Sequence, residues 1–220
     1  MKKIISFSLW GNNPKYTIGA IKNAELSKII YPDWICRFYC GKSVPLDIIE
    51  KLKSYDNVEV IEMDEYGDWN GMFWRFYACE DADVMISRDT DSRLSFREKS
   101  AVDEWMNSDK DFHIMRDHPY HNALILGGMW GVRNGLLKNI IPIINEYNKG
   151  NFWQVDQNFL KEKIYPIIKN NSFVHDEFMN FENWKKSFPT ERNNKEFIGD
   201  VFDENENRHP EYYKIIKYEN

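Results

Sequence analysis

The chain has 220 residues, of which 42% are hydrophobic and 15% aromatic, and this composition excludes an intrinsically disordered protein. Its formal net charge of −6 lacks the basic excess that is typical of nucleic-acid-binding proteins, so no nucleic-acid partner is expected. The length favours a single domain over residues 1–220 with a sizeable core.

The cysteines and the apolar segments indicate where the protein resides. Cys36, Cys40 and Cys79 are too few and odd in number for a disulfide framework, which favours a reducing compartment. The apolar run before Gly11 is too short for a signal peptide and lacks a small-residue cleavage site. No window approaches the roughly 20 apolar residues of a membrane-spanning helix. We therefore expect a cytoplasmic protein without a transmembrane segment.

Strand-like and helical segments alternate along the first part of the chain, which predicts βαβ units. The expected strands are Lys3–Leu9, Ile35–Tyr39, Val58–Met63 and Ala82–Ile86. The expected helices are Lys15–Ile30, Leu46–Ser54 and Asn70–Cys79. In the second strand both thiols fall on the face of Trp34 and Phe38, so we interpret them as core residues. Gly-x-Gly-x-x-Gly is missing after the first strand, so any bound phosphates would need another partner.

The same alternation continues in the second part. Ser95 and Glu98 match a capping box that begins a helix ending near Asn107. Further strands are expected at Phe112–Asp117, Ala123–Arg133 and Ser172–Asp176, and helices at 134–148, with an interruption at Pro142, and from about Asn151. Residues 181–220 are a polar extension that we expect to form a solvated surface. The pattern predicts an α/β fold with a mostly parallel central sheet flanked by helices.

Two acids follow the strand that ends at Ile86 and Ser87. Asp89 and Asp91 are spaced i and i+2, so an extended backbone projects both to one side and Thr90 to the other. Two converging carboxylates repel each other unless a cation lies between them, and oxygen ligands suit Mn²⁺ or Mg²⁺. The alternative is that both are solvated turn acids, since Asp is common in turns. Their place after a buried strand favours a metal–diphosphate site.

The order of these segments resembles the DXD region of glycosyltransferases with the GT-A fold: a helix containing Trp74-Arg75-Phe76-Tyr77, the strand Asp83–Ser87 and the loop Arg88–Asp91. The resemblance implies a GT-A-like, Rossmann-like sheet. It also implies a nucleotide-diphosphate sugar donor of the UDP or GDP type, a divalent metal held by Asp89 and Asp91, and transfer to a glycan or other hydroxyl acceptor. His175, at the end of the last strand, resembles the third metal ligand of that family. A satisfied hydrogen-bonding histidine is the alternative.

The resemblance also implies residues that contact the donor. They are Leu9, Trp10, Gly11, Asn12, Arg75, Asp89, Thr90, Asp91, Gly128 and Arg192. Several have a structural alternative: Gly11-Asn12-Asn13 is also an ordinary turn and helix cap, and Arg75 is either a donor contact or a surface charge, with Asp89 as a reasonable partner if it is buried. Arg192 or Lys186 could clamp the diphosphate from a closing loop. Trp130, beside Gly128, either stacks on a sugar or packs in the core.

The catalytic base is expected to be a carboxylate. Asp156-Gln157 resembles the pair that GT-A enzymes carry at the head of a late helix, so Asp156 is the first candidate and Asp117 the second. An acid in the first helical turn is also favourable to the helix dipole. Two other functions remain open from the sequence: a metal-dependent phosphohydrolase, which uses acids at strand ends, and a non-catalytic carbohydrate-binding domain, which uses aromatic platforms.

Overall fold

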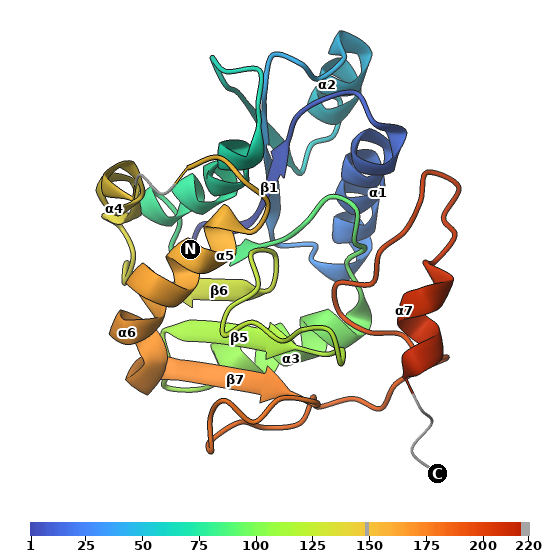
Figure 1. Ribbon diagram of the computed structural model, residues 1–220. Coiled ribbons are helices and arrows are strands. Elements are labelled where there is room, and N and C mark those ends of the chain that lie inside the picture. The colour runs from blue at the N-terminus through green and yellow to red at the C-terminus, as the bar shows by residue number, and fades with distance from the viewer. Residues whose placement is uncertain (148–149, 217–220) are drawn as a thin grey trace.

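The computed structural model describes residues 1–147 and 150–216 (Figure 1). The strands are β1 (Lys3–Leu9), β2 (Ile35–Cys40), β3 (Val58–Glu62), β4 (Val84–Ser87), β5 (Phe112–Arg116), β6 (Trp130–Arg133) and β7 (Ser172–Asp176). They form one sheet in the order β3-β2-β1-β4-β6-β5-β7. Neighbouring strands are parallel except at β6, which is antiparallel to both β4 and β5. The predicted α/β fold with a mostly parallel sheet is confirmed.

Helices cover both faces of this sheet (Figure 1). They are α1 (Pro14–Ile30), α2 (Leu46–Lys53), the 3-10 helix η1 (Trp69–Glu80), α3 (Phe96–Met106), α4 (Ile140–Glu146), α5 (Val155–Phe159), the π-helix η2 (Leu160–Ile164), α6 (Tyr165–Ile168), the 3-10 helix η3 (Lys169–Asn171) and α7 (Pro210–Ile215). One buried cluster packs α1, α2 and α3 against the sheet, and another packs η1, α4, α5, η2 and α6 against the opposite face. In the described part of the chain no helix combines the length and apolar character needed to cross a membrane.

Successive side chains of β1 point to opposite faces of the sheet and pack against different helices. Ile5, Phe7 and Leu9 join the cluster under α1 and α2, whereas Ile4 joins the cluster under η1. Ser8 also faces η1, where its hydroxyl accepts from the backbone N–H of Arg75 at 2.9 Å. The Ser8 hydroxyl therefore holds η1 against the end of β1, and with it Arg75, one of the candidate site residues.

The cysteines of β2 are core residues, as predicted. Cys36 and Cys40 are buried with Trp34 and Phe38 in the cluster under α1 and α2, and both thiols are free. Burial raises the pKa of each thiol to about 12, so neither is a reactive thiolate near neutral pH.

The structure differs from the predicted elements in the region of residues 123–148. Only Trp130–Arg133 of the expected strand pairs in the sheet, and the preceding residues form a loop. The following helix begins at Ile140 because Asn134 and Gly135 have positive φ values of 57° and 70° and form a turn. Pro142 lies in the first turn of α4, where a missing N–H is tolerated, so the expected interruption does not occur. Asn148 lies outside the described residues.

The C-terminal extension is more than a solvated surface. Phe188, Phe197 and Ile198 are buried, and Val201 forms a β-bridge with Ser92 beside the acid-bearing loop. The extension therefore packs against the sheet domain and contributes to its core, as far as residue 216. Residues 217–220 lie outside the described part.

His113 of β5 and His175 of β7 form a buried hydrogen-bonded pair. His175 Nε2 lies 2.9 Å from the carboxylate of Glu104, which can only accept, so this nitrogen carries the proton in the neutral ring. His175 Nδ1 must then accept from His113 Nε2 at 2.8 Å. Burial lowers the pKa of both imidazoles, in His113 well below its usual range. Burial thus disfavours protonation of both rings, although Glu104 opposes the effect at His175.

We expect the free energy of unfolding to decrease as the pH falls below about 6.5. Histidines of the unfolded chain take up protons near pH 6.5, whereas the folded pair does so only at lower pH. The folded state is therefore most stable above pH 6.5, and it loses stability as the pH falls towards the lower folded-state pKa values. The slope for each ring can approach about 1.4 kcal/mol per pH unit. Urea unfolding at pH 7.5, 6.5 and 5.5 measures it. His175→Gln should make the dependence less steep without abolishing it, because burial also lowers the pKa of His118 and His121. His209→Gln, at an exposed position, should preserve the full slope; identical slopes in both variants would contradict the assignment.

Candidate functional site

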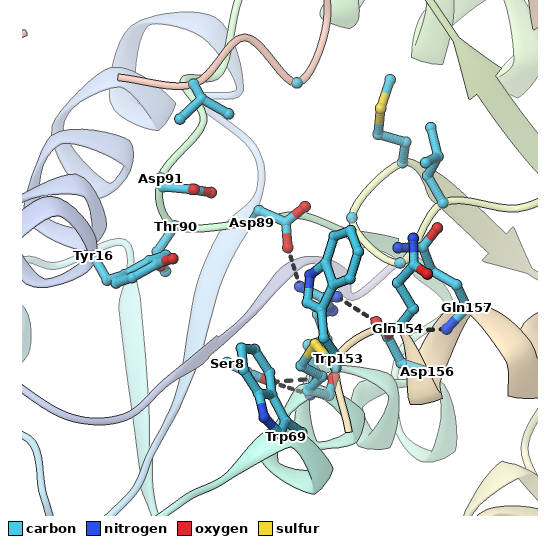
Figure 2. A pocket seen from close by; sticks show the side chains of 18 of the residues that line it. Ser8, Tyr16, Trp69, Asp89, Thr90, Asp91, Trp153, Gln154, Asp156 and Gln157 are labelled. Atoms are coloured by element: carbon cyan, nitrogen blue, oxygen red, sulfur yellow. Dashed lines mark hydrogen bonds and ion pairs between the residues drawn. The ribbon is translucent and has the colours of Figure 1, made fainter. Parts of the chain in front are cut away.

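A cleft of about 370 Å³ opens at the carboxyl ends of β1 and β4 (Figure 2). The chain passes from β1 outward to β2 and β3 and then returns to β4 on the other side of β1, so the strand order reverses here. Open α/β sheets bind ligands at such a point. The cleft is lined by the end of β1, η1, the loop after β4, the loop 126–129, the head of α5 and part of the C-terminal extension.

The loop after β4 brings both predicted acids to the cleft, where Asp89 and Asp91 belong to its lining. The loop is held from α1: Asn23 donates to the Ser92 carbonyl at 2.9 Å and accepts from the Leu94 N–H at 3.0 Å. Gly19 of α1 lies so close that an added Cβ would be 2.0 Å from the Thr90 carbonyl oxygen. The acids therefore lie on a turn that packing against α1 holds in place, with the Asp89 side chain 47% exposed and the Asp91 side chain 16% exposed.

The loop is also anchored from α3 and from the C-terminal extension. Arg88 is buried and donates through Nε to Glu98 at 2.8 Å. Ser95 caps α3 as predicted, accepting from the Glu98 N–H at 3.1 Å, but the Glu98 carboxylate binds Arg88 and not the cap backbone. On the other side, the Phe202 N–H donates to the Asp91 carbonyl at 2.9 Å. Segments far apart in the sequence thus fix the backbone of the acids.

Arg75 joins two carboxylates inside the cleft. Its guanidinium donates to Asp89 and, through Nη2, to Asp156 at 2.7 Å (Figure 2). Burial alone would lower the pKa of Arg75, but the two carboxylates outweigh it and raise the pKa. Burial raises the pKa of Asp156, and Arg75 offsets part of that effect. The expected partnership between Arg75 and Asp89 is confirmed.

Two glycines make room for this acid–arginine–acid arrangement. A Cβ on Gly127 would lie 2.1 Å from Asp156 Oδ2, and a Cβ on Gly128 would lie 2.0 Å from Asp89 Oδ2. The Gly127 carbonyl is fixed by Ser87 Oγ at 2.7 Å and by the indole N–H of Trp130 at 3.1 Å. The loop around these glycines therefore presses against both carboxylates, which no larger residue would permit.

Asp89 and Asp91 have the chemistry of a divalent-cation site. Burial raises the pKa of Asp91, and the charge of Asp89 raises it further, while Lys15 at 2.7 Å opposes both effects. Asp91 contacts Lys15 through Oδ2, and Asp89 contacts Arg75 through Oδ1. Each acid therefore keeps a second carboxylate oxygen outside its ion pair. Hard oxygen donors on two mutually repelling acids fit Mn²⁺ or Mg²⁺.

His175 is not brought to these acids. Its side chain is buried against β5 and α3, its ring nitrogens contact His113 and Glu104, and it does not line the cleft. The expectation that it is the third metal ligand is therefore wrong for this structure. The physical reason is the sheet order, since β6 and β5 lie between β4 and β7.

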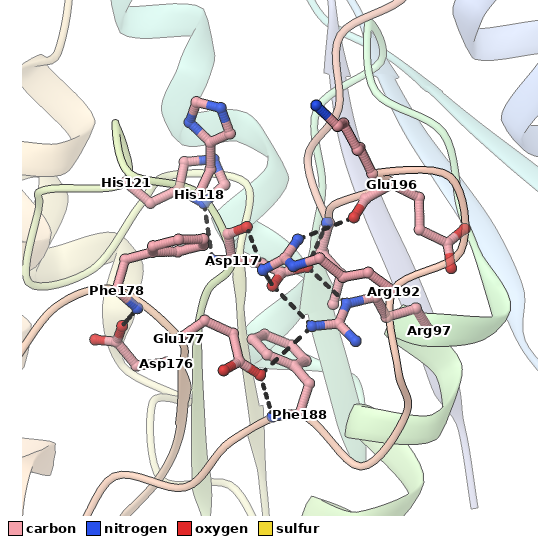
Figure 3. A network of polar contacts seen from close by, with 12 residues as sticks. Arg97, Asp117, His118, His121, Asp176, Glu177, Phe178, Phe188, Arg192 and Glu196 are labelled. Carbon is pink, nitrogen blue, oxygen red and sulfur yellow. Dashed lines mark hydrogen bonds and ion pairs between the residues drawn. The ribbon is translucent and has the colours of Figure 1, made fainter. Parts of the chain in front are cut away.

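Asp117 and Arg192 belong to a different network (Figure 3). Asp117 is fully buried and accepts from Arg97 at 2.8 and 2.9 Å, from Arg192, and from the Ile198 N–H at 2.9 Å. Neither Asp117 nor Arg192 lines the cleft; Arg192 lines a separate hollow with Phe178 and other residues. The structure thus gives Asp117 a structural role in place of the second-choice base, and it does not place Arg192 as a diphosphate clamp.

The other donor contacts implied by the sequence divide into two groups. Leu9 and Trp10 line the cleft, as do Thr90 and Gly128. Gly11 and Asn12 do not: the Gly11 N–H donates to Ser43 Oγ at 2.7 Å, and Asn12 is exposed in the turn before α1. Trp130, considered as a sugar platform, is instead a core residue stacked on Phe112.

Several residues of the cleft were not identified in the sequence analysis. They are Tyr16, Trp69, Met72, His121, Trp153, Gln154, Gly199 and Val201. Trp153 precedes the Asp156-Gln157 pair by only three residues, and its position outside any apolar periodicity was a signal that could have identified it. Gly199 and Val201 come from the C-terminal extension, and only the three-dimensional packing reveals their place.

No family model and no curated protein matches the sequence. The fold, however, is similar to those of solved glycosyltransferases. S. aureus TarS in complex with UDP-GlcNAc has 15% identity and a TM-score of 0.56 over 80% of this chain and 56% of that chain. The mannosyltransferase PcManGT from Pyrobaculum calidifontis, in complex with GDP-Man and Mn²⁺, has 9% identity and a TM-score of 0.54 over 80% and 55%.

A glycosyltransferase involved in the glycosylation of the major capsid of PBCV-1 has 15% identity and a TM-score of 0.53, over 80% of this chain and 82% of that chain. This chain thus spans just over half the length of the first two structures and most of the third. At these identities the similarity establishes the fold, and the resemblance to GT-A-type glycosyltransferases is confirmed at that level.

We expect Gly128→Ala to displace Asp89, because the new Cβ would lie 2.0 Å from Asp89 Oδ2. The free energy of unfolding, measured with urea, should fall by about 1–3 kcal/mol, the usual cost of forcing an added carbon into a packed site, while circular dichroism remains that of a folded protein. Asn12→Ala is the matched control, since Asn12 is exposed and does not line the cleft. An unchanged free energy of unfolding in Gly128→Ala would contradict the close approach of this loop to Asp89.

Proposed function

We propose that this protein is a metal-dependent glycosyltransferase that moves a sugar from a UDP- or GDP-type donor to a hydroxyl group of a glycan or other acceptor. The observation that carries the proposal is the meeting of Asp89, Asp91 and Asp156 in one cleft at the reversal point of the sheet. The fold shared with solved glycosyltransferases supports it.

Asp89 and Asp91 are the residues that would hold the metal. When bound, a divalent ion neutralises the charge that develops on the diphosphate leaving group. Because His175 lies outside the cleft, the proposed metal ligands from the protein are carboxylate oxygens alone. Such a set suits Mg²⁺ as well as Mn²⁺, so the preference for Mn²⁺ that an imidazole ligand would bring is absent.

Leu9, Trp10 and Thr90 are proposed to contact the donor. Leu9 and Trp10 lie at the end of β1, and Thr90 lies between the two acids, and all three line the cleft that contains the proposed metal-binding carboxylates. Gly128 presents backbone there and thereby leaves room for the donor. Arg75 acts through its neighbours, because its guanidinium orients Asp89 and Asp156.

Asp156 is the proposed base. Its carboxylate removes the proton of the acceptor hydroxyl, whose oxygen then forms a bond to the anomeric carbon of the donor sugar. The bond from that carbon to the diphosphate oxygen breaks, and its electron pair leaves with the nucleoside diphosphate. Burial raises the pKa of Asp156 and so makes it a stronger base, while Arg75 favours its ionised form.

We expect Asp91→Ala to abolish Mn²⁺-dependent sugar transfer, because one of two metal-binding carboxylates is lost. Purified protein is incubated with radiolabelled UDP- and GDP-sugars, Mn²⁺ and a mixture of glycans, and transfer and release of free sugar are both counted. Asp109→Ala removes an exposed acid remote from the cleft and should keep full activity. Full activity of Asp91→Ala, or of the wild type in excess chelator, would overturn the metal assignment. Release of sugar with no acceptor dependence would favour a hydrolase.

We expect Asp156→Asn to lower the transfer rate about 10²–10⁴-fold, which is the usual contribution of a general base. The amide oxygen can still accept from Arg75, although the amide then loses the hydrogen bond that Asp156 Oδ1 accepts from the Gln157 N–H at 2.8 Å. Because Asp89 keeps its own contact with Arg75, nucleotide affinity should change little. Single-turnover rates at saturating donor measure the effect. A rate within threefold of wild type would exclude Asp156 as the base.

A further inference from the structure

Two tryptophans are exposed at the mouth of the cleft. Trp69, at the start of η1, is 44% exposed and Trp153, just before α5, is 64% exposed. Both line the cleft together with the acids (Figure 2). Tryptophan is on average a highly buried residue, and exposed indole surface that borders a polar cleft is typical of a surface that a ligand covers.

The loops that carry the two tryptophans are joined to each other. Asn151 donates to Asp68 Oδ2 at 2.7 Å, and Asp68 uses its other oxygen to accept from the Asn70 N–H at 2.8 Å at the start of η1. Trp69 lies next to Asp68, and Trp153 lies two residues after Asn151. The hydrogen bond between Asn151 and Asp68 therefore fixes the positions of the two loops that carry the exposed indoles.

Gln154, between Trp153 and α5, adopts an unusual backbone conformation. Its φ of 71° and ψ of 11° lie in the left-handed region, which residues other than glycine rarely adopt. Its side chain makes no capping hydrogen bond to α5 that would account for this conformation. Gln154 lines the cleft (Figure 2). A strained residue in a binding cleft is an observation that points towards function. Its carboxamide supplies two donors and an acceptor beside the indole of Trp153.

We propose that Trp153, Gln154 and Trp69 form a subsite for the ring of a saccharide acceptor, an inference that rests on the proposed function. A sugar ring has an apolar C–H face that packs on an indole and hydroxyl groups that a carboxamide can bind. Asp156 follows Gln154 by two residues and lines the same cleft. The acceptor, which gives up its proton to Asp156, must therefore lie close to Trp153 and Gln154. The aromatic surface therefore belongs to the acceptor, and the acceptor is a saccharide.

The test measures binding of simple sugars to the whole chain. The probes are methyl glycosides of glucose, galactose, mannose and N-acetylglucosamine, followed by saturation-transfer NMR in the presence of Mn²⁺ with UDP or with GDP. We expect at least one glycoside to bind the wild type and to bind Trp153→Ala at least tenfold more weakly, with recovery in Trp153→Phe. Trp184→Ala is the matched control, because Trp184 is 45% exposed and does not line the cleft.

The outcomes separate this subsite from the proposed function. Nucleotide binding without binding of any glycoside, or glycoside binding that is equal in Trp153→Ala and Trp184→Ala, overturns the subsite and leaves the transferase proposal standing. Glycoside binding that depends on Trp153 in a protein that binds neither nucleotide supports the subsite and overturns the transferase, in favour of a carbohydrate-binding domain. Circular dichroism of each variant verifies the fold, which an exposed side chain should not disturb.

Discussion

The candidate site depends on one buried guanidinium. Arg75 lies between Asp89 and Asp156, and its own burial would be unfavourable without their two charges. Removing one carboxylate would leave the cation undercompensated, and removing Arg75 would leave two acids in a confined space. The arrangement therefore ties the loop after β4 to the head of α5 through η1. This is why the proposed metal-binding acid and the proposed base have a fixed relation to each other before any ligand arrives.

The backbone around this interaction is built to accommodate it. Gly127 and Gly128 bring the loop 126–129 against the two carboxylates, Gly19 lets α1 approach the acid loop, and Phe202 of the C-terminal extension donates to Asp91 from the opposite side. Each of these contacts also contributes to packing. The same residues thus stabilise the fold and position the site, and a substitution at one of them is expected to affect both.

The sequence allowed prediction of features that depend on local chemistry. The strand alternation, the caps at Asn13 and Ser95, and the acids after β4 follow from side-chain period and hydrogen bonding over a few residues. It failed where the answer depends on the order of strands. The antiparallel strand β6 enters the sheet beside β4, so β7 lies three strands from β4 and His175 cannot reach Asp89. The burial of Asp117 with Arg97 and Arg192 likewise arises only when β5, α3 and the C-terminal extension pack together.

The two acids of the loop differ in how a cation can reach them. Asp89 is bound to a buried arginine, and that interaction is part of the fold. Asp91 is bound to Lys15 at 2.7 Å, and the side chains of this pair are 16% and 31% exposed, so Lys15 is the more exposed partner. The proposed divalent ion would displace this ammonium from Asp91 and supply the positive charge in its place, whereas the contact between Arg75 and Asp89 would persist. Lys15 therefore offsets part of the negative charge of the two carboxylates, and the proposed ion would do the same in its place.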